Sequence, residues 1–308
     1  MAATKIPNEL LELGVLADAT NFTDSILISQ NASTGTLDAA NHNTGLGDSV
    51  FAALTSGDDN TAIGSGALDA NTTGAENTAV GKDSLGANTT AGENTAVGQN
   101  ALLTNTTGGA NTALGKSSLA SNTTASNNTA VGKSALGANT TGSDNNAFGY
   151  GALQANTTGT DNTALAKQAL YSNTTGSYNT AVGDRALQAN TTASGNVSVG
   201  ADSMYNNTTG SSNVAVGADA LKANTTGANN IAIGSGALDA NTTASNNTVV
   251  GKDAATANTT GDAMTAIGFG ALANNTTAAN NTAVGYIALI SNTTGASNTA
   301  VGSLALQS

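Results

Sequence analysis

The aromatic residues of this chain are the side chains best suited to contact a ligand, and they recur at a fixed spacing. Tyr150, Phe269 and Tyr286 are separated by multiples of 17 residues, and so are Tyr171 and Tyr205. An exposed aromatic ring can stack on a sugar ring or pack against a protein partner. We therefore consider these five residues candidate surface-recognition residues, with solvated side chains at unconstrained sites as the simpler interpretation.

The remaining side chains offer little reactive chemistry. The 308 residues include one histidine, His42, and no cysteine, which disfavours a Ser-His-Asp triad, a His-based metal site and any thiolate chemistry. Acidic residues such as Asp59, Glu76 and Glu93 recur in only some places, without the regular aspartate spacing of a calcium-binding β-roll. We expect no enzymatic activity, no cofactor and no bound metal.

Charge and hydrophobicity exclude two further classes of partner. Eight Lys and Arg residues against twenty Asp and Glu give a net charge of −12, which disfavours nucleic-acid binding. No apolar run approaches the roughly 18 residues of a membrane span. The N-terminus also lacks the basic start and apolar stretch of a secretory signal. We therefore expect no nucleic-acid partner and no membrane insertion.

Most of the chain is one repeated unit. Copies begin at Asn60, Asn77 and Asn94, so the period is 17 residues, and the array extends without insertion or deletion from residue 43 to residue 308. We number positions from the first residue of each copy, so that Asn60 is position 1 and Glu76 is position 17. Residues 43–308 then form about sixteen copies, and residues 1–42 form a separate N-terminal segment.

The unit is predicted to be β-structure. Glycine at positions 5 and 15 costs roughly 1 kcal/mol each in a helix, and Thr, Val and Ile exchange at position 2, as in strands. A second strand or extended piece is expected at positions 8–11, and Asn-Thr-Thr-Gly forms a turn. Units that each pair with the next would give an all-β parallel β-solenoid of about sixteen coils.

In such a stack each position becomes a column of like residues. We predict that positions 4 and 9 form the core, and that alanine at position 3 faces the other way and packs closely against further copies of the chain. The predicted core residues include Ile63, Val80, Val97, Leu68, Leu85 and Leu102. The predicted oligomer face includes Ala62, Ala79, Ala96 and Ala113.

Asparagine recurs at positions 1 and 12, where stacked side chains can exchange amide hydrogen bonds between coils. We interpret these columns as structural, with a ligand or ion column as the alternative. Residues 1–42 are predicted to cap the first coil or to attach the fibre to something else, with a short helix at 7–13 and a strand at 25–29. The array stops within a coil at Ser308, which suggests a continuation, a partner or a cleavage there.

The segments Asn-Val-Ala-Val-Gly (213–217) and Asn-Ile-Ala-Ile-Gly (230–234) resemble the head repeats of trimeric autotransporter adhesins, which are left-handed parallel β-rolls. The longer pattern, with Ala-Leu and Asn-Thr-Thr-Gly, is more similar to the repeat arrays of bacteriophage tail-fibre proteins. This resemblance covers residues 43–308 and implies a left-handed coil and a homotrimeric fibre. In many such fibres a chaperone domain cuts itself off after a serine, which an end at Ser308 would fit.

Three functions follow as hypotheses. The first is a structural and adhesive tail fibre of a virion, joined to the virion or tail through residues 1–42 and binding a host-surface glycan or protein. The second is a subunit of an extracellular or cell-surface filament or adhesin. The third, an ice-binding solenoid, is disfavoured because Thr at position 2 exchanges with Val and Ile, as at an inward-facing site, and because the Thr-Thr pair lies at adjacent turn positions.

Overall fold

A computed structural model describes residues 14–19, 22–29 and 39–307 of the chain. The chain divides into two compact units, Met1–Ser143 and Asp144–Ser308, and each is considered by itself. The described residues contain strands and turns and no helix. The predicted helix at 7–13 and the terminal Ser308 lie outside them.

The first unit holds strands β1 to β8 and the second unit holds β9 to β18. In the first unit the strands are β1 (Gly14–Ala19), β2 (Phe22–Ser29), β3 (Thr44–Leu46), β4 (Thr61–Ile63), β5 (Thr78–Val80), β6 (Thr95–Val97), β7 (Thr112–Leu114) and β8 (Thr129–Val131). In the second they are β9 (Asn146–Phe148), β10 (Thr163–Leu165), β11 (Thr180–Val182), β12 (Val197–Val199), β13 (Val214–Val216), β14 (Ile231–Ile233), β15 (Thr248–Val250), β16 (Thr265–Ile267), β17 (Thr282–Val284) and β18 (Thr299–Val301).

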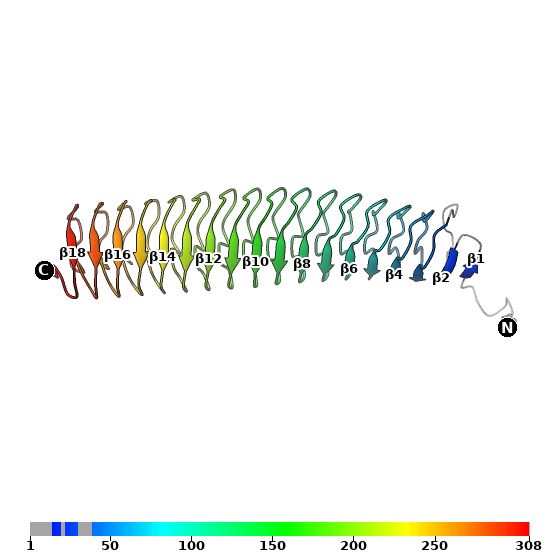
Figure 1. Ribbon diagram of the computed structural model, residues 1–308, viewed down its shortest axis with the longest axis horizontal. Coiled ribbons are helices and arrows are strands. Elements are labelled where there is room, and N and C mark those ends of the chain that lie inside the picture. The colour runs from blue at the N-terminus through cyan, green and yellow to red at the C-terminus, as the bar shows by residue number, and fades with distance from the viewer. Residues whose placement is uncertain (1–13, 20–21, 30–38, 308) are drawn as a thin grey trace. The chain divides into compact units, whose positions relative to one another are not determined.

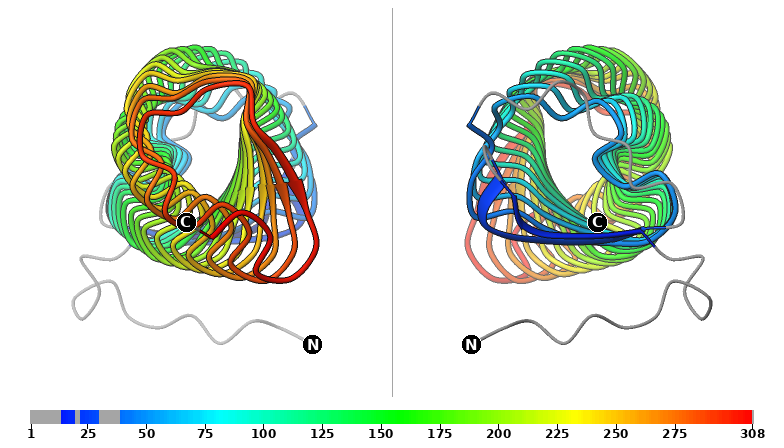
Figure 2. Two further views of the ribbon diagram at one scale, coloured as in Figure 1. Left: turned by 90° about the vertical axis from the view of Figure 1, so that its left-hand side faces the viewer. Right: turned by 90° about the vertical axis from the view of Figure 1, so that its right-hand side faces the viewer.

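Each unit is a parallel β-solenoid. From β2 to β8 in the first unit and from β9 to β18 in the second, consecutive strands pair in parallel and in register, so that Thr61 lies beside Thr78 and Thr163 beside Thr180. The strand arrows from β3 to β8 in the first unit, and from β9 to β18 in the second, run side by side in one direction (Figure 1). Seen end-on, the yellow to red coils of the second unit follow one another with their strands on the same side (Figure 2). The predicted all-β parallel β-solenoid with one coil per repeat is confirmed.

The N-terminal segment supplies the first coil's partner. Strands β1 and β2 form an antiparallel hairpin, and β2 pairs in parallel with β3, placing Leu27 beside Gly45. The strand predicted at 25–29 therefore lies within β2, and it covers the edge that the first repeat would otherwise expose.

The second strand predicted at positions 8–11 is not formed. Residues 67–70, which hold these positions in one coil, are turns, and Leu68 at position 9 has a left-handed backbone with φ of 51°. Such a conformation costs a non-glycine residue roughly 1–2 kcal/mol. Because Leu68 is fully buried, the roughly 1.5–3 kcal/mol gained by burying a leucine offsets that strain.

The predicted directions of positions 3 and 4 are wrong. Ala62, Ala79, Ala96 and Ala113 are fully buried inside their coils, so they do not form an oligomer face. At position 4, Ile63 is 39% exposed, and Val80 and Val97 are only half-buried, so this column lies on the outer surface. Leu68, Leu85 and Leu102 at position 9 are fully buried, as expected.

The physical reason for the inversion is the narrow interior of the coil. At Gly45, the first position-3 residue, an added Cβ would lie 2.7 Å from Leu27 Cδ1 and 3.1 Å from Phe51 Cδ2. In the second unit, Ser198 at position 3 donates to the carbonyl of Ser203 at position 8, 2.8 Å away. Position 3 thus packs against positions 8 and 9 of its own coil, where a methyl group is what fits.

Two buried asparagine columns hold each coil closed. Asn77 at position 1 and Asn88 at position 12 both donate to the carbonyl of Ala91, at 2.9 and 3.0 Å. Each also donates to the amide oxygen one coil earlier, on Asn60 and Asn71 respectively. Because buried polar groups must be paired, the same contacts close the coil and join it to its neighbour.

Glycine at position 5 allows the coils to approach closely. Gly217 has φ of 136°, and a Cβ there would lie 2.6 Å from the backbone of Gly234 in the next coil. A side chain would therefore force neighbouring coils apart, and the left-handed region of φ disfavours other residues as well.

The position-1 column is interrupted once in the second unit, and this interruption gives the first prediction. Met264 replaces asparagine and offers only its sulfur, which contacts Nδ2 of Asn275 at 3.1 Å. We expect Met264→Asn to stabilise the fold by about 1 kcal/mol, the net value of a restored buried hydrogen bond. Thermal unfolding followed by circular dichroism measures the effect.

The matched control is Asn230→Met, which should lower the Tm because it removes contacts that Met264→Asn would add. An unchanged or lower Tm for Met264→Asn would contradict the assigned role of the column.

Candidate binding surfaces

The outer face of the strands carries most of the large hydrophobic residues that are exposed. Positions 2 and 4 project outward from every three-residue strand, while position 3 is buried. Position 2 holds Thr, Val or Ile, except for Asn146, and position 4 holds mostly Val, Ile or Leu. We call this surface the outer β-face. Its most exposed residues at position 4 include Leu46, Ile63, Leu114, Leu165, Ile233 and Ile267.

Charged residues line both sides of the outer β-face. The turn before each strand, positions 16 and 17, contains acidic residues and no Lys or Arg: Asp58, Asp59, Glu76, Glu93, Asp144, Asp161 and Asp262. The turn after each strand contains at position 6 five of the eight basic residues: Lys82, Lys116, Lys133, Lys167 and Lys252. Asp48 and Asp184 are the acidic exceptions at position 6, and position 7 of the same turn adds Arg185 but also Asp83, Asp202, Asp219 and Asp253. The outer β-face therefore has an acidic margin on one side and, on the other, a margin of mixed charge with lysines at position 6.

Two of the five predicted recognition residues form one site. Phe269 and Tyr286, at position 6 of consecutive coils in the second unit, stack with ring centroids 5.6 Å apart and planes at 15°. Lys252, one coil earlier, places its Nζ 5.5 Å from the Phe269 ring centroid. Both rings are exposed, at 45% and 54%. We call Lys252, Phe269 and Tyr286 the aromatic row.

The other three predicted aromatics do not join this row. Tyr150 is exposed at position 6, whereas Tyr171 is half-buried and lies over Gly151, where an added Cβ would meet its ring at 3.3 Å. Tyr205 is half-buried beneath the guanidinium of Arg185, 5.5 Å from its ring centroid. Tyr178, 67% exposed, was missed by the sequence reasoning. Tyr178 lies at position 17, which is mostly occupied by charged and polar residues. This composition indicates an exposed position and could have identified Tyr178 from the sequence.

A charged cluster surrounds Tyr205 in the second unit. Arg185 Nη2 lies 2.8 Å from Asp202 Oδ2, and Lys222 Nζ lies 2.7 Å from Asp219 Oδ1 and 3.8 Å from Asp202. The hydrogen bond to Asp219 raises the pKa of Lys222. Burial, together with repulsion by the Asp219 carboxylate, raises the pKa of Asp239 above its ordinary value. Opposite charges pair in this cluster, although Arg185 Nε and Asp202 Oδ1 are buried without a hydrogen-bond partner, so it resembles a cross-coil stabilising network more than a ligand site.

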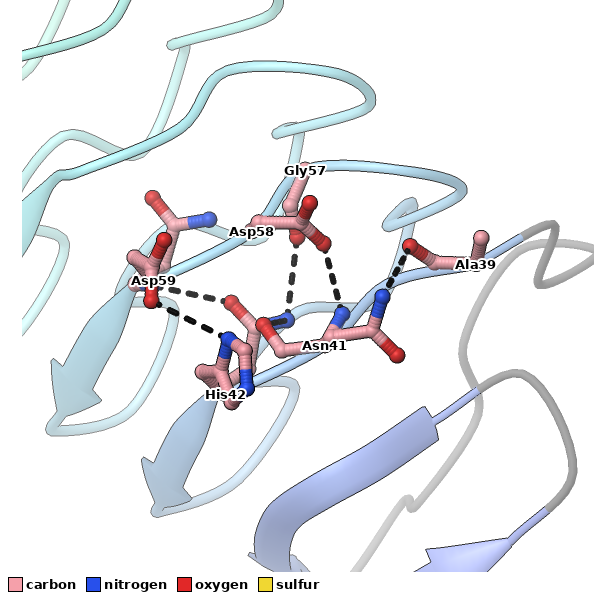
Figure 3. Close-up of polar contacts among 8 residues, drawn as sticks. Ala39, Asn41, His42, Gly57, Asp58 and Asp59 are labelled. Atoms are coloured by element: carbon pink, nitrogen blue, oxygen red, sulfur yellow. Dashed lines mark hydrogen bonds and ion pairs between the residues drawn. The ribbon is translucent and has the colours of Figure 1, made fainter.

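The single histidine makes a surface contact at the start of the first repeat (Figure 3). His42 Nδ1 lies 3.3 Å from Asp59 Oδ1, and both side chains are 57% exposed. Beside it, the backbone N–H of Asn41 donates to Asp58 Oδ1 at 2.7 Å. These contacts join the first coils to one another and bring no nucleophile to the imidazole.

Metal and membrane sites are not evident in the part of the chain that the structure describes. Residues 14–19, 22–29 and 39–307 contain no group of three His, Cys, Asp or Glu side chains placed to hold a metal ion. Nor do these residues include a helix with the length and hydrophobicity of a membrane span. No protein family, curated protein or solved structure matches the chain.

The raised pKa of Asp239 gives a prediction about stability and pH. Because its pKa in the folded chain is above the ordinary value of 3.8, the charged carboxylate is disfavoured by the fold. The contribution of Asp239 to the free energy of unfolding is therefore most favourable at acidic pH, and it declines as the pH rises through the folded-state pKa. We expect Asp239→Asn to raise the Tm at pH 7.

Thermal unfolding of the variant and the native chain across pH 3 to 8 measures this dependence, and the difference should shrink as the solution is acidified. Asp69, whose pKa burial also raises, provides a second case in the first unit, and Asp69→Asn should behave in the same way. A lower Tm for both variants at pH 7 would contradict the assignment.

Proposed function

We propose that the chain is a structural and adhesive fibre protein of the tail-fibre kind that its repeat resembles. Three copies, the number that the resemblance implies, associate through their outer β-faces into a rigid, left-handed coil stack. Residues 1–42 attach the fibre to a virion or tail component, and the exposed sides of the coils contact a glycan or protein on the host surface. A place in the virion is part of the same proposal.

The observation that carries the proposal is the outer β-face. Monomeric soluble proteins rarely expose long contiguous apolar surfaces, and such surfaces mark sites of association. Here Val80 and Val97 are half-buried and Leu114 is exposed on three successive strands. Completing their burial against another copy would contribute roughly 1 kcal/mol per coil. Because every coil contributes, the free energy of association increases with the number of coils in contact.

The charged margins favour parallel association. Glu76 precedes and Lys82 follows the strand β5, and Asp161 and Lys167 flank β10 in the same way. Around an axis along the stack, parallel copies bring the position-6 lysines of one copy toward the acidic margin of the next. Face-to-face antiparallel copies would instead place acidic margins together, which is unfavourable. Repulsion between acidic margins thus disfavours antiparallel chains.

We expect the full-length chain to sediment as a discrete homotrimer, and the double variant Val80→Asp/Val97→Asp to dissociate while keeping its circular dichroism spectrum. Carboxylates on the outer β-face would be buried in the trimer but exposed in a single chain. The control, Thr90→Asp/Thr107→Asp, adds the same charge to the same coils at exposed position 14 and should remain trimeric. A monomeric native chain, or a trimeric Val80→Asp/Val97→Asp variant, would refute the proposed association.

Cross-linking tests the parallel arrangement. The chain contains no cysteine, so Glu76→Cys/Lys82→Cys introduces the only two thiols. A bismaleimide link within one copy leaves a single chain, so only links between copies give covalent oligomers. Parallel copies should give covalently closed oligomers from the double variant. Cross-links from Glu76→Cys alone would instead indicate antiparallel copies.

A second candidate function is ice binding, and the outward direction of position 2 favours it. The exchange of Thr with Val and Ile at this position does not mark an inward site, because Thr78 and Thr95 lie half-exposed beside the outer aliphatic column. The regular, in-register array of Thr and aliphatic side chains is a surface of the kind that could order water. A monomer that shows thermal hysteresis, lost in Thr78→Lys/Thr95→Lys, would support this function over the fibre. A trimer without hysteresis would exclude it.

A further inference from the structure

The aromatic row ends on a ring that has only one neighbour within the row. Phe269 lies between Lys252 on one side and Tyr286 on the other. The next residue at position 6 after Tyr286 is Ser303, which is exposed and carries only a hydroxymethyl group. Because consecutive coils are spaced by about 4.8 Å, the space above Ser303 has the thickness of one more stacked ring.

The neighbours of the Tyr286 ring on the next coil are both apolar and polar. Leu304, whose backbone N–H donates to the Tyr286 carbonyl at 2.9 Å, is 50% exposed beside Ser303. Tyr286 and Ser303 each carry a hydroxyl group. A ligand that suits this ring face therefore has one apolar flat face and hydroxyl groups around its rim.

Charge narrows the class of ligand further. The Lys252 ammonium lies 2.6 Å from the Asp253 carboxylate, so the one cation of the row is already neutralised. The net charge of −12 disfavours anionic ligands such as nucleic acids. An aromatic anchor from a protein partner would need a closely packed, water-free pocket, whereas the Tyr286 ring is 54% exposed. A neutral sugar, with C–H groups on one face and hydroxyls at its edge, fits best.

We propose that the Tyr286 ring face above Ser303, at the end of the aromatic row, is a binding site for a neutral pyranose of a surface saccharide. The sugar stacks on Tyr286 as the next member of the row. Phe269 and Lys252 act behind it by holding the Tyr286 ring in place. This inference deepens the proposed adhesive function by naming the site and the class of ligand.

Saturation-transfer difference NMR on the full-length chain tests this site with four neutral probes, the methyl glycosides of glucose, galactose, mannose and N-acetylglucosamine. We expect at least one of them to bind. By analogy with bases stacked on aromatic side chains, Tyr286→Ala should weaken that binding about five-fold or more. Tyr286→Phe should retain it, since it keeps the ring face. Ser303→Phe should abolish it, because the added ring occupies the place of the sugar.

Tyr205→Ala is the matched control, since Arg185 covers that ring, and it should leave saccharide binding unchanged. The proposal is overturned if none of the four glycosides binds, or if binding survives both Tyr286→Ala and Ser303→Phe. It is also overturned if N-acetyl-phenylalanine amide binds at Tyr286 while the glycosides do not. Sedimentation of the same samples separates the proposed trimer from the proposed saccharide site. A trimer that binds none of the glycosides contradicts only the saccharide site.

Discussion

The structure depends on the requirement that each coil satisfy the backbone of the next. A three-residue strand buries little by itself, and its N–H and C=O groups find partners only when another copy of the same strand lies in register beside it. The asparagine columns add to this pairing, since Asn77 contacts both Ala91 in its own coil and Asn60 in the previous one. This constraint explains why the 17-residue period is constant along the array, because an inserted residue would move every following residue of that coil out of its column.

The interior of the coil is small, and its size determines which side chains face outward. Position 3 packs against positions 8 and 9, so only a methyl group fits beside a leucine. Larger aliphatic residues at positions 2 and 4 are therefore displaced to the outside, where they form the outer β-face. The same packing that makes a single coil stable thus creates an apolar surface, and the proposed association of copies is a consequence of how the coil is filled.

Much of the architecture was accessible from the sequence. The spacing of Asn60, Asn77 and Asn94 predicted the coil length, and the recurring Asn and Leu positions predicted buried columns that the structure contains. The direction of the strand was predicted wrongly, because Val and Ile at positions 2 and 4 look like core residues when propensity alone is considered. Likewise, no pattern predicted that position 9 would adopt a left-handed backbone, since leucine rarely does so.

A signal for the correct direction was nevertheless present in the compensating substitutions. Gly45 at position 3 is paired with Phe51 at position 9 of its coil, and Val249 at position 3 is paired with Ala255 at position 9. A smaller residue at one position accompanies a larger one at the other, as expected of side chains that share a fixed volume. For the binding surfaces, the sequence identified Phe269 and Tyr286, but only the structure showed that their rings stack on one another.

The central claim, that position 3 faces inward against position 9, is tested most directly by a double-mutant cycle at Val249 and Ala255. We expect Val249→Ala to leave a cavity and Ala255→Leu to overpack the coil, so that each lowers the free energy of unfolding. The two changes together should restore the Ala-Leu pair of the other coils and return the stability to the native value or above, with a coupling energy of about 1–3 kcal/mol. If Ala255→Leu is harmless and the two effects simply add, the two side chains do not share the interior and the account is wrong.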